Sequence, residues 1–98
     1  MAQFDVFRTA HGELLLDCQS EAFANLKTRL AAPLIPIDDS PPRRARLNPV
    51  FEIDGHAYAM VTQFAAAVGT NALQAKVANL VEFRFDIVGA FDMLLTGV

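Results

Sequence analysis

The sequence has very little of the chemistry that most enzymes use. Among its 98 residues there are one cysteine, two histidines and two serines. Neither serine lies in a nucleophile-elbow pattern, and His11 and His56 stand at turn-like positions where solvated histidines are common. There is no glycine-rich phosphate loop, and no pair of Cys, His, Asp or Glu has metal-ligand spacing. We therefore expect no catalytic residues, no cofactor and no metal, and a protein that is not an enzyme.

Disulfides and membrane segments are also lacking. Cys18 is the single cysteine and lies in an apolar run, which excludes an intramolecular disulfide and is typical of a small core residue. The sequence shows neither a basic-then-apolar leader nor an uncharged run of membrane-spanning length. We therefore expect a cytoplasmic protein without membrane contact, folded as one domain over residues 1–98.

Positive charge is scarce in the second half of the chain. Residues 1–46 carry six basic and six acidic groups, whereas residues 47–98 carry two and five, which accounts for the net charge of −3. This distribution argues against a protein that mainly binds nucleic-acid phosphates. The hydrophobic fraction of 53% is high for a soluble domain and has two explanations, an alanine-rich core or apolar surface kept for a partner or a second subunit.

Short apolar runs separated by turn residues predict a mainly β domain with a small antiparallel sheet. Phe4-Asp5-Val6-Phe7 and Leu14-Leu15-Leu16 flank a turn at His11-Gly12, so we expect these two strands to pair. A third strand is expected over residues 30–35, ending at Pro36. Residues 21–27 fit either a loop or a short helical turn, and the polar residues 38–46 fit a surface loop.

The clearest local pattern is a β-hairpin. Val50, Phe51 and Ile53, and then Tyr58, Met60 and Val61, lie on either side of Asp54-Gly55. An Asp-Gly pair readily takes the positive φ angles of a type I′ turn. The sequence therefore predicts two antiparallel strands joined by a two-residue turn.

The last quarter of the chain changes to a helical period. One apolar stripe recurs every three or four residues, at Leu80, Phe83, Ile87, Phe91 and Leu94. Asn79, with Glu82 three residues later, predicts the helix start, and Gly97 predicts its end. A second apolar set lies off that stripe, at Phe85, Val88 and Leu95. A helix that is apolar on two sides predicts a dimer contact or a partner groove.

The order of several short motifs resembles that of the CcdB family, the toxin half of a plasmid-type toxin–antitoxin pair. In that family a Leu-x-Pro-Val motif, a glycine-containing hairpin and a Met-x-Thr motif follow one another, as residues 47–50, 54–55 and 60–62 do here. Further blocks are similar in the same order over nearly the whole chain: Gln3-Phe4-Asp5-Val6-Phe7, Leu16-Asp17-Cys18-Gln19-Ser20-Glu21, Thr28-Arg29-Leu30-Ala31-Ala32-Pro33-Leu34, Val77-Ala78-Asn79-Leu80 and Gly97-Val98.

This resemblance implies a fold, an activity and partners. The fold would be a CcdB/MazF-like, SH3-like barrel with a C-terminal α-helix, assembled as a homodimer. The activity would be binding of the DNA gyrase A subunit, which traps the gyrase–DNA cleavage complex and is neutralised by a CcdA-like antitoxin. DNA would be contacted only indirectly, through gyrase or the antitoxin.

The resemblance also implies a gyrase contact at the chain end. The last residues of CcdB-like proteins insert into the gyrase A subunit, which points here to Ala22, Phe23, Asp92, Leu95, Thr96, Gly97 and Val98. This chain has Thr96 where the best-known pattern has Trp, and a threonine cannot fill the same pocket. Weaker gyrase binding is therefore expected, and a homologue that keeps the fold without poisoning gyrase is the alternative.

An antitoxin contact is implied at two loops, through Arg8, His11, Arg43, Arg44 and Arg46. The three arginines of the second loop fit a basic lip for an acidic partner segment, or simply a solubilising loop. A third interpretation is that they hold RNA phosphates in a MazF-like endoribonuclease. The acidic remainder of the chain disfavours that interpretation.

Overall fold

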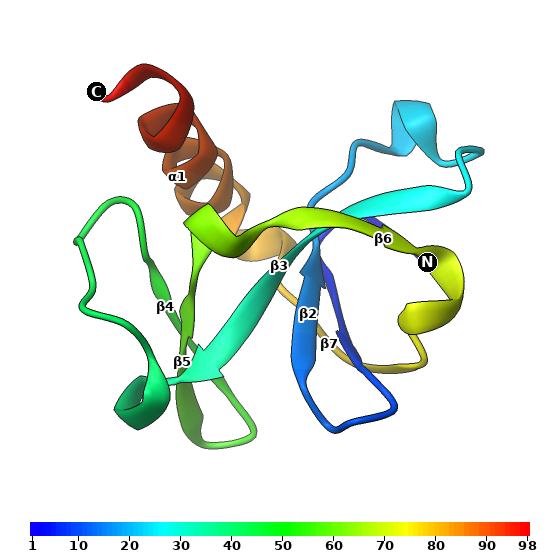
Figure 1. The fold of residues 1–98 in the computed structure, drawn as a ribbon, viewed down its shortest axis with the longest axis horizontal. Coiled ribbons are helices and arrows are strands. Elements are labelled where there is room, and N and C mark those ends of the chain that lie inside the picture. The colour runs from blue at the N-terminus through cyan, green and yellow to red at the C-terminus, as the bar shows by residue number, and fades with distance from the viewer.

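The computed structural model describes residues 1–98 as a curled antiparallel sheet carrying one helix at its C-terminal end (Figure 1). The sheet order is β4-β5-β3-β2-β1-β7, and β6 pairs with β3. The strands are β1 (Asp5–Arg8), β2 (Leu14–Asp17), β3 (Thr28–Pro36), β4 (Val50–Ile53), β5 (His56–Met60), β6 (Ala66–Gly69) and β7 (Ala75–Asn79), and the helix is α1 (Arg84–Thr96). The expected mainly β fold with a C-terminal helix is confirmed.

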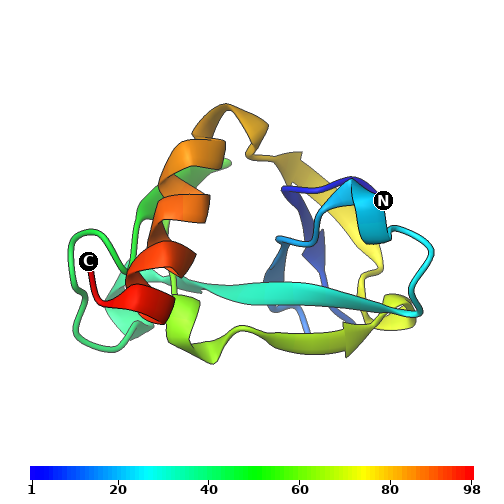
Figure 2. The same ribbon diagram turned by 90° about the horizontal axis from the view of Figure 1, so that it is seen from above.

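Strand β3 organises the sheet because it pairs with three other strands. Its nine residues pair with β2 on one edge, and on the other edge with β6 near its start and β5 near its end. Ala31 faces both Asp17 and Ala66, and Leu34 faces both Leu14 and Met60. The sheet bends along this strand into a half-barrel, which Figure 2 shows from above.

The predicted hairpin is confirmed. Asp54 and Gly55 have φ angles of 52° and 79°, the left-handed pair that a type I′ turn requires, and Ile53 faces His56 across a two-residue loop. The pairing of the first two strands is also confirmed, with Val6 opposite Leu16. Strands β6 and β7 were not predicted, because each has a single β-branched residue and no alternation of large apolar and polar residues.

The core lies between the concave side of the sheet and one face of α1. Ile87 and Ala90 of the helix and Val6, Leu16 and Met60 of the strands are fully buried. Burial of side chains of this size stabilises the fold by about 1.5–3 kcal/mol each for all but the alanine.

The first predicted helix stripe is thus only partly buried. Leu80 and Ile87 are in the core, and Phe91 packs against it. Phe83 is 37% exposed, with its ring centroid 5.3 Å from that of Phe51, and Leu94 is 44% exposed.

The predicted helix start was wrong. Asn79 is the last residue of β7 and pairs with Asp5, so it is not an N-cap of α1. Its Oδ1 instead accepts a hydrogen bond of 2.9 Å from the Val81 N–H, at a 3₁₀ turn (Val81–Phe83) that precedes the helix. The helix end is as predicted: Gly97 is left-handed, with φ 79°, and its N–H donates to the Met93 carbonyl.

A buried carboxylate joins the first strand to the last. Asp5 is 2% exposed and accepts hydrogen bonds of 2.8 Å from the Ala2 N–H and from the Asn79 amide, while Lys76 Nζ lies 3.2 Å away. Burial alone would raise the pKa of Asp5, but these donors outweigh it, so that the pKa lies below its ordinary value of 3.8. The ionised carboxylate therefore stabilises the folded state.

The substitution Asp5→Asn should reduce the free energy of unfolding at pH 7 by about 1–3 kcal/mol, because it removes charge-assisted hydrogen bonds. The folded-state pKa is lower than the unfolded one, so this stabilisation is complete above about pH 4 and is lost as the pH falls through the folded-state pKa. Urea unfolding from pH 7 to pH 2 should show the parent and Asp5→Asn converging. Asp54→Asn, in the exposed hairpin turn, is the control and should show no such convergence.

Candidate functional site

The end of α1 leaves its side chains in solvent while its backbone is held in place. Leu95 and Val98 are 80% and 74% exposed. The Thr96 hydroxyl donates to the Asp92 carbonyl at 2.7 Å and accepts a weaker hydrogen bond, 3.4 Å long, from the Val98 N–H. With the left-handed turn at Gly97, these bonds give the chain end a defined shape. An ordered, exposed apolar chain end is suited to inserting into a partner.

A strip of apolar side chains runs along the outside of α1. The outer helix strip consists of Val81, in the 3₁₀ turn before the helix, and of Phe85, Val88 and Leu95 on the helix; they are 48%, 77%, 47% and 80% exposed. The Arg84 guanidinium carbon lies 4.7 Å from the Phe85 ring centroid, so the ring makes a cation–π contact with Arg84. The predicted second apolar set therefore lies off the core, as expected from its spacing.

The loop between β3 and β4 carries three of the predicted site residues, Arg43, Arg44 and Arg46. None of them forms an ion pair within the chain. Asn48, which is 2% exposed, holds the loop through hydrogen bonds with the backbone of Arg44 and with the Met60 carbonyl. The guanidinium groups thus extend from an anchored loop and are available to an acidic partner.

The arginine loop lies against the end of α1. Arg44 and Arg46 line a hollow of about 470 Å³ together with Met93, Leu94 and Gly97. Arg46 also borders a second hollow of about 470 Å³ that includes Phe85. Sequence reasoning assigned these arginines and the helix end to different partners, whereas the fold places them side by side.

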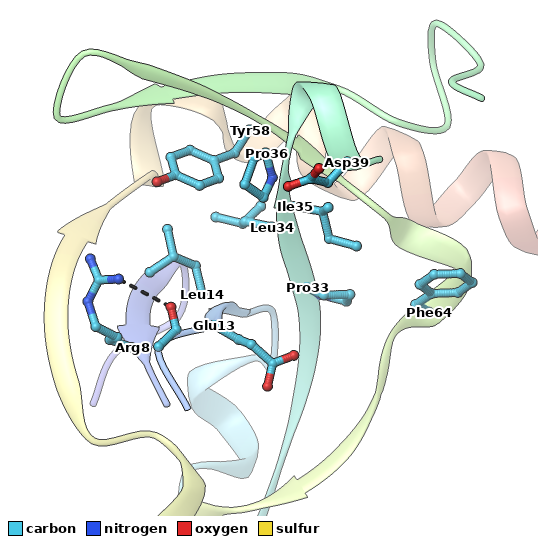
Figure 3. Close-up of a pocket in the computed structure, with 11 residues that line it drawn as sticks. Arg8, Glu13, Leu14, Pro33, Leu34, Ile35, Pro36, Asp39, Tyr58 and Phe64 are labelled. Atoms are coloured by element: carbon cyan, nitrogen blue, oxygen red, sulfur yellow. Dashed lines mark hydrogen bonds between the residues drawn. The ribbon is translucent and has the colours of Figure 1, made fainter. Parts of the chain in front are cut away.

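A separate pocket forms where the β1–β2 hairpin meets β3 and β5 (Figure 3). It has a volume of about 450 Å³ and is lined by Arg8, Gly12, Glu13, Leu14, residues 33–36, Asp39, Tyr58 and Phe64. Arg8 is oriented by a hydrogen bond of 3.2 Å from its Nη1 to the Gly12 carbonyl. Charges of both signs surround an apolar floor, an arrangement that suits a peptide segment with mixed side chains.

The structure separates the residues of the predicted antitoxin site from one another, and it does the same for the predicted gyrase site. Arg8 lines the β1–β2 hairpin pocket, whereas His11 is exposed outside it, and Arg44 and Arg46 belong to the hollow beside the helix end. Ala22 and Phe23, in the 3₁₀ turn Glu21–Phe23, lie at the opposite end of the long axis from the C-terminus (Figures 1 and 2). One protomer therefore does not bring these two residues to the helix end.

Sequence reasoning missed a buried ion pair. Arg29 and Asp17 are 1% and 0% exposed, with Asp17 Oδ2 lying 2.9 Å from Arg29 Nε and 2.7 Å from Nη2. Burial opposes the charge of Arg29, but the hydrogen bond and attraction of Asp17 raise its pKa. Strand alternation gave no signal for this pair, because Arg29 has the opposite parity to Ala32 and Leu34, the residues of β3 that belong to the core. The pair instead lies on the other face of the sheet, where each charge is buried against the other.

Cys18 is confirmed as a structural residue. It is half-buried, and its Sγ lies 3.4 Å from the Leu16 carbonyl oxygen. Burial and the neighbouring Asp17 raise the pKa of the thiol to about 12, which suppresses the reactive thiolate at neutral pH. The fold brings no three of the histidine, cysteine and acidic side chains together as metal ligands. No helix has the length and apolar character needed to cross a membrane.

Comparison with known families gives one match. The family model described as "CcdB protein" matches residues 3–97, which takes in every strand and the helix. No curated protein matches the chain.

Proposed function

Because the chain belongs to the CcdB family, we propose that it is the toxin of a type II toxin–antitoxin module and binds the DNA gyrase A subunit, trapping the gyrase–DNA cleavage complex. The toxins of this family are non-enzymatic gyrase poisons, in agreement with the expectation that this protein is not an enzyme. The observation that carries the proposal is the ordered, exposed helix end with Leu95 and Val98. Gyrase acts in the cytoplasm, where the protein would then work.

The gyrase contact would centre on Thr96, Gly97 and Val98, with Asp92 and Leu95 beside them. Leu95 and Val98 offer apolar surface that the fold does not use. The Thr96 hydroxyl is engaged with the helix backbone, so this residue adds little to an interface. A large aromatic anchor is missing, which supports weaker binding than in the pattern with Trp. A homologue that has lost gyrase poisoning remains the alternative.

A homodimer would make use of the outer helix strip. Four large apolar side chains exposed on α1 and the turn before it exceed what a small monomer usually leaves in solvent. A second copy would also supply another helix end and another turn with Ala22 and Phe23. The helix end and the turn with Ala22 and Phe23 are far apart in one protomer. In the dimer, one protomer could supply the first and its partner the second.

The antitoxin would contact the β1–β2 hairpin pocket and the arginine loop. The pocket, with Arg8 and Asp39 at its rim, offers an apolar floor for a peptide, and His11 lies on the same hairpin. Arg43, Arg44 and Arg46 have no acidic partner within the chain, which favours an acidic, disordered antitoxin segment.

A MazF-like endoribonuclease is less well supported. His56 and Asp38 line one shallow hollow, but no hydrogen bond joins them and no arginine lines it. The arginine loop and a possible acid–base pair are therefore not combined in one site.

The dimer proposal predicts that Phe85→Ser combined with Leu95→Ser converts a dimer into a monomer, because it removes apolar surface from the interface. Light scattering at micromolar concentration should report the dimer mass for the parent. The control is Phe64→Ser with Leu30→Ser, which removes exposed apolar side chains elsewhere. A parent that is monomeric contradicts the proposal.

The antitoxin proposal predicts that Arg43→Glu with Arg44→Glu weakens binding of an acidic antitoxin peptide about tenfold at low salt, since like charges would then meet. The dependence of the dissociation constant on salt should also become flatter. Lys27→Glu with Asn71→Asp and Gln74→Glu makes the same change in net charge at exposed residues away from the loop and should retain binding. Equal affinity for both variants would mean that the arginine loop only promotes solubility.

The gyrase proposal predicts that Val98→Asp weakens binding to the gyrase A subunit at least about tenfold, because it forces a charge into an apolar contact. Val98 is exposed, so the melting temperature should change by no more than about 3 °C. Thr96→Trp should strengthen binding, and Thr96→Ser, which keeps the hydroxyl, is its control. If Val98→Asp binds as well as the parent, the helix end is not the gyrase site and the silent homologue becomes the better account.

A further inference from the structure

The loop between β2 and β3, residues 18–27, exposes large apolar side chains, and only Cys18 at its start packs against the core. Phe23 and Leu26 are 57% and 50% exposed, and no residue of the 3₁₀ turn Glu21–Phe23 is buried. Burial of apolar side chains therefore contributes little to the order of the turn that carries Phe23. Its conformation must be held by other interactions.

Hydrogen bonds from side chains hold this loop. The Gln19 amide acts as a clamp, because its Oε1 accepts from the Leu30 N–H at 3.0 Å and its Nε2 donates to the Phe23 carbonyl at 3.0 Å. Ser20 Oγ accepts from the Ala22 N–H at 3.1 Å and caps the turn. One glutamine thus ties the carbonyl of the exposed phenylalanine to strand β3.

The buried ion pair fixes the base of this clamp. Asp17 Oδ1 accepts from the Gln19 N–H at 3.1 Å, while its Oδ2 binds Arg29. Arg29 Nη2 also lies 3.5 Å from Glu21 Oε1, and the same oxygen accepts from the Gln3 N–H. Hydrogen bonds and ion pairs therefore connect the buried Asp17–Arg29 pair with the turn that carries Phe23.

We propose that Gln19, together with Asp17, Arg29 and Glu21, holds Phe23 and Leu26 in the conformation that binds the gyrase A subunit, an inference that rests on the proposed function. A buried ion pair adds little net stability compared with apolar residues of the same size, but it defines geometry. A loop that is ordered beforehand loses less conformational entropy on binding. These four are positioning residues, and Phe23 is the contact that they position.

Gln19→Glu tests the clamp with one atom changed. The glutamate keeps an acceptor for the Leu30 N–H but has no donor for the Phe23 carbonyl. If the clamp keeps the loop in its binding conformation, affinity for the gyrase A subunit should fall about tenfold, as expected when the competent fraction drops to about a tenth. Gln74→Glu has the same charge change at an exposed residue without side-chain hydrogen bonds, and should bind as the parent does.

A second variant and a second measurement separate positioning from a general loss of stability. Gln19→Met removes both hydrogen bonds without adding charge and should weaken binding in the same direction. Hydrogen exchange should accelerate at the Phe23, Ala24 and Leu26 amides, which bond within the loop, and at the Leu30 amide, which loses its Gln19 acceptor, and stay unchanged in the amides of β2 and β3 that bond to other strands. Exchange that accelerates equally in the strands would overturn a specific role for the clamp.

A double-mutant cycle gives the most direct test. Phe23→Ala should weaken gyrase A binding in the parent and have a much smaller effect in the Gln19→Glu background, where the ring is no longer held in place. If the two substitutions have additive effects on the binding free energy, Gln19 does not act through Phe23 and the proposal is overturned.

The remaining outcomes distinguish this inference from the proposed function. If the parent does not bind the gyrase A subunit, the proposed function fails and the positioning role fails with it. If the parent binds and Gln19→Glu binds equally well, only the positioning role is overturned. If the variants change the dissociation of the dimer and not the affinity for gyrase A, the loop contacts a second copy of the chain and the proposal is likewise wrong.

Discussion

The structure depends on one strand that is hydrogen-bonded to three others. Strand β3 is nine residues long, whereas its neighbours have four or five, so it extends beyond each of them. Because β5 and β6 share one of its edges, the sheet bends along β3 into a half-barrel. A single 13-residue helix then covers the concave side, with only Ile87 and Ala90 fully buried. The exposed apolar side chains on the outside of α1 are a direct result of this arrangement.

Local patterns in the sequence were sufficient for some elements. The hairpin could be predicted because Asp54-Gly55 sets its turn geometry through adjacent residues alone. The end of α1 could be predicted for the same reason, since Gly97 adopts a left-handed conformation that other residues disfavour. The helical period also placed Phe85 and Leu95 outside the core, where the structure has them.

Elements that depend on distant partners could not be predicted. Asn79 has the composition of an N-cap, but its pairing with Asp5, 74 residues away, places it in the sheet. Strands β6 and β7 have no strong strand pattern of their own, and they pair with β3 and β1, which are distant in the sequence. The same applies to the candidate site: Arg46 and Gly97 are far apart in the sequence and share one hollow only because the β3–β4 loop lies against α1. The family resemblance supplied residue roles, whereas only the fold shows which of them are neighbours.

The last turn of the chain makes almost no contribution to the core, since Leu95 and Val98 are mostly exposed and the Thr96 hydroxyl bonds only to the backbone of Asp92 and Val98. Selection for a folded protein therefore places little constraint on these positions, and random substitution can change them while the half-barrel persists. In the toxin proposed above, gyrase poisoning could then be lost in a few mutational steps. If the antitoxin binds as proposed above, the product of that drift would still occupy it, and a harmless copy could alter the balance between an active toxin and its antidote in the same cell.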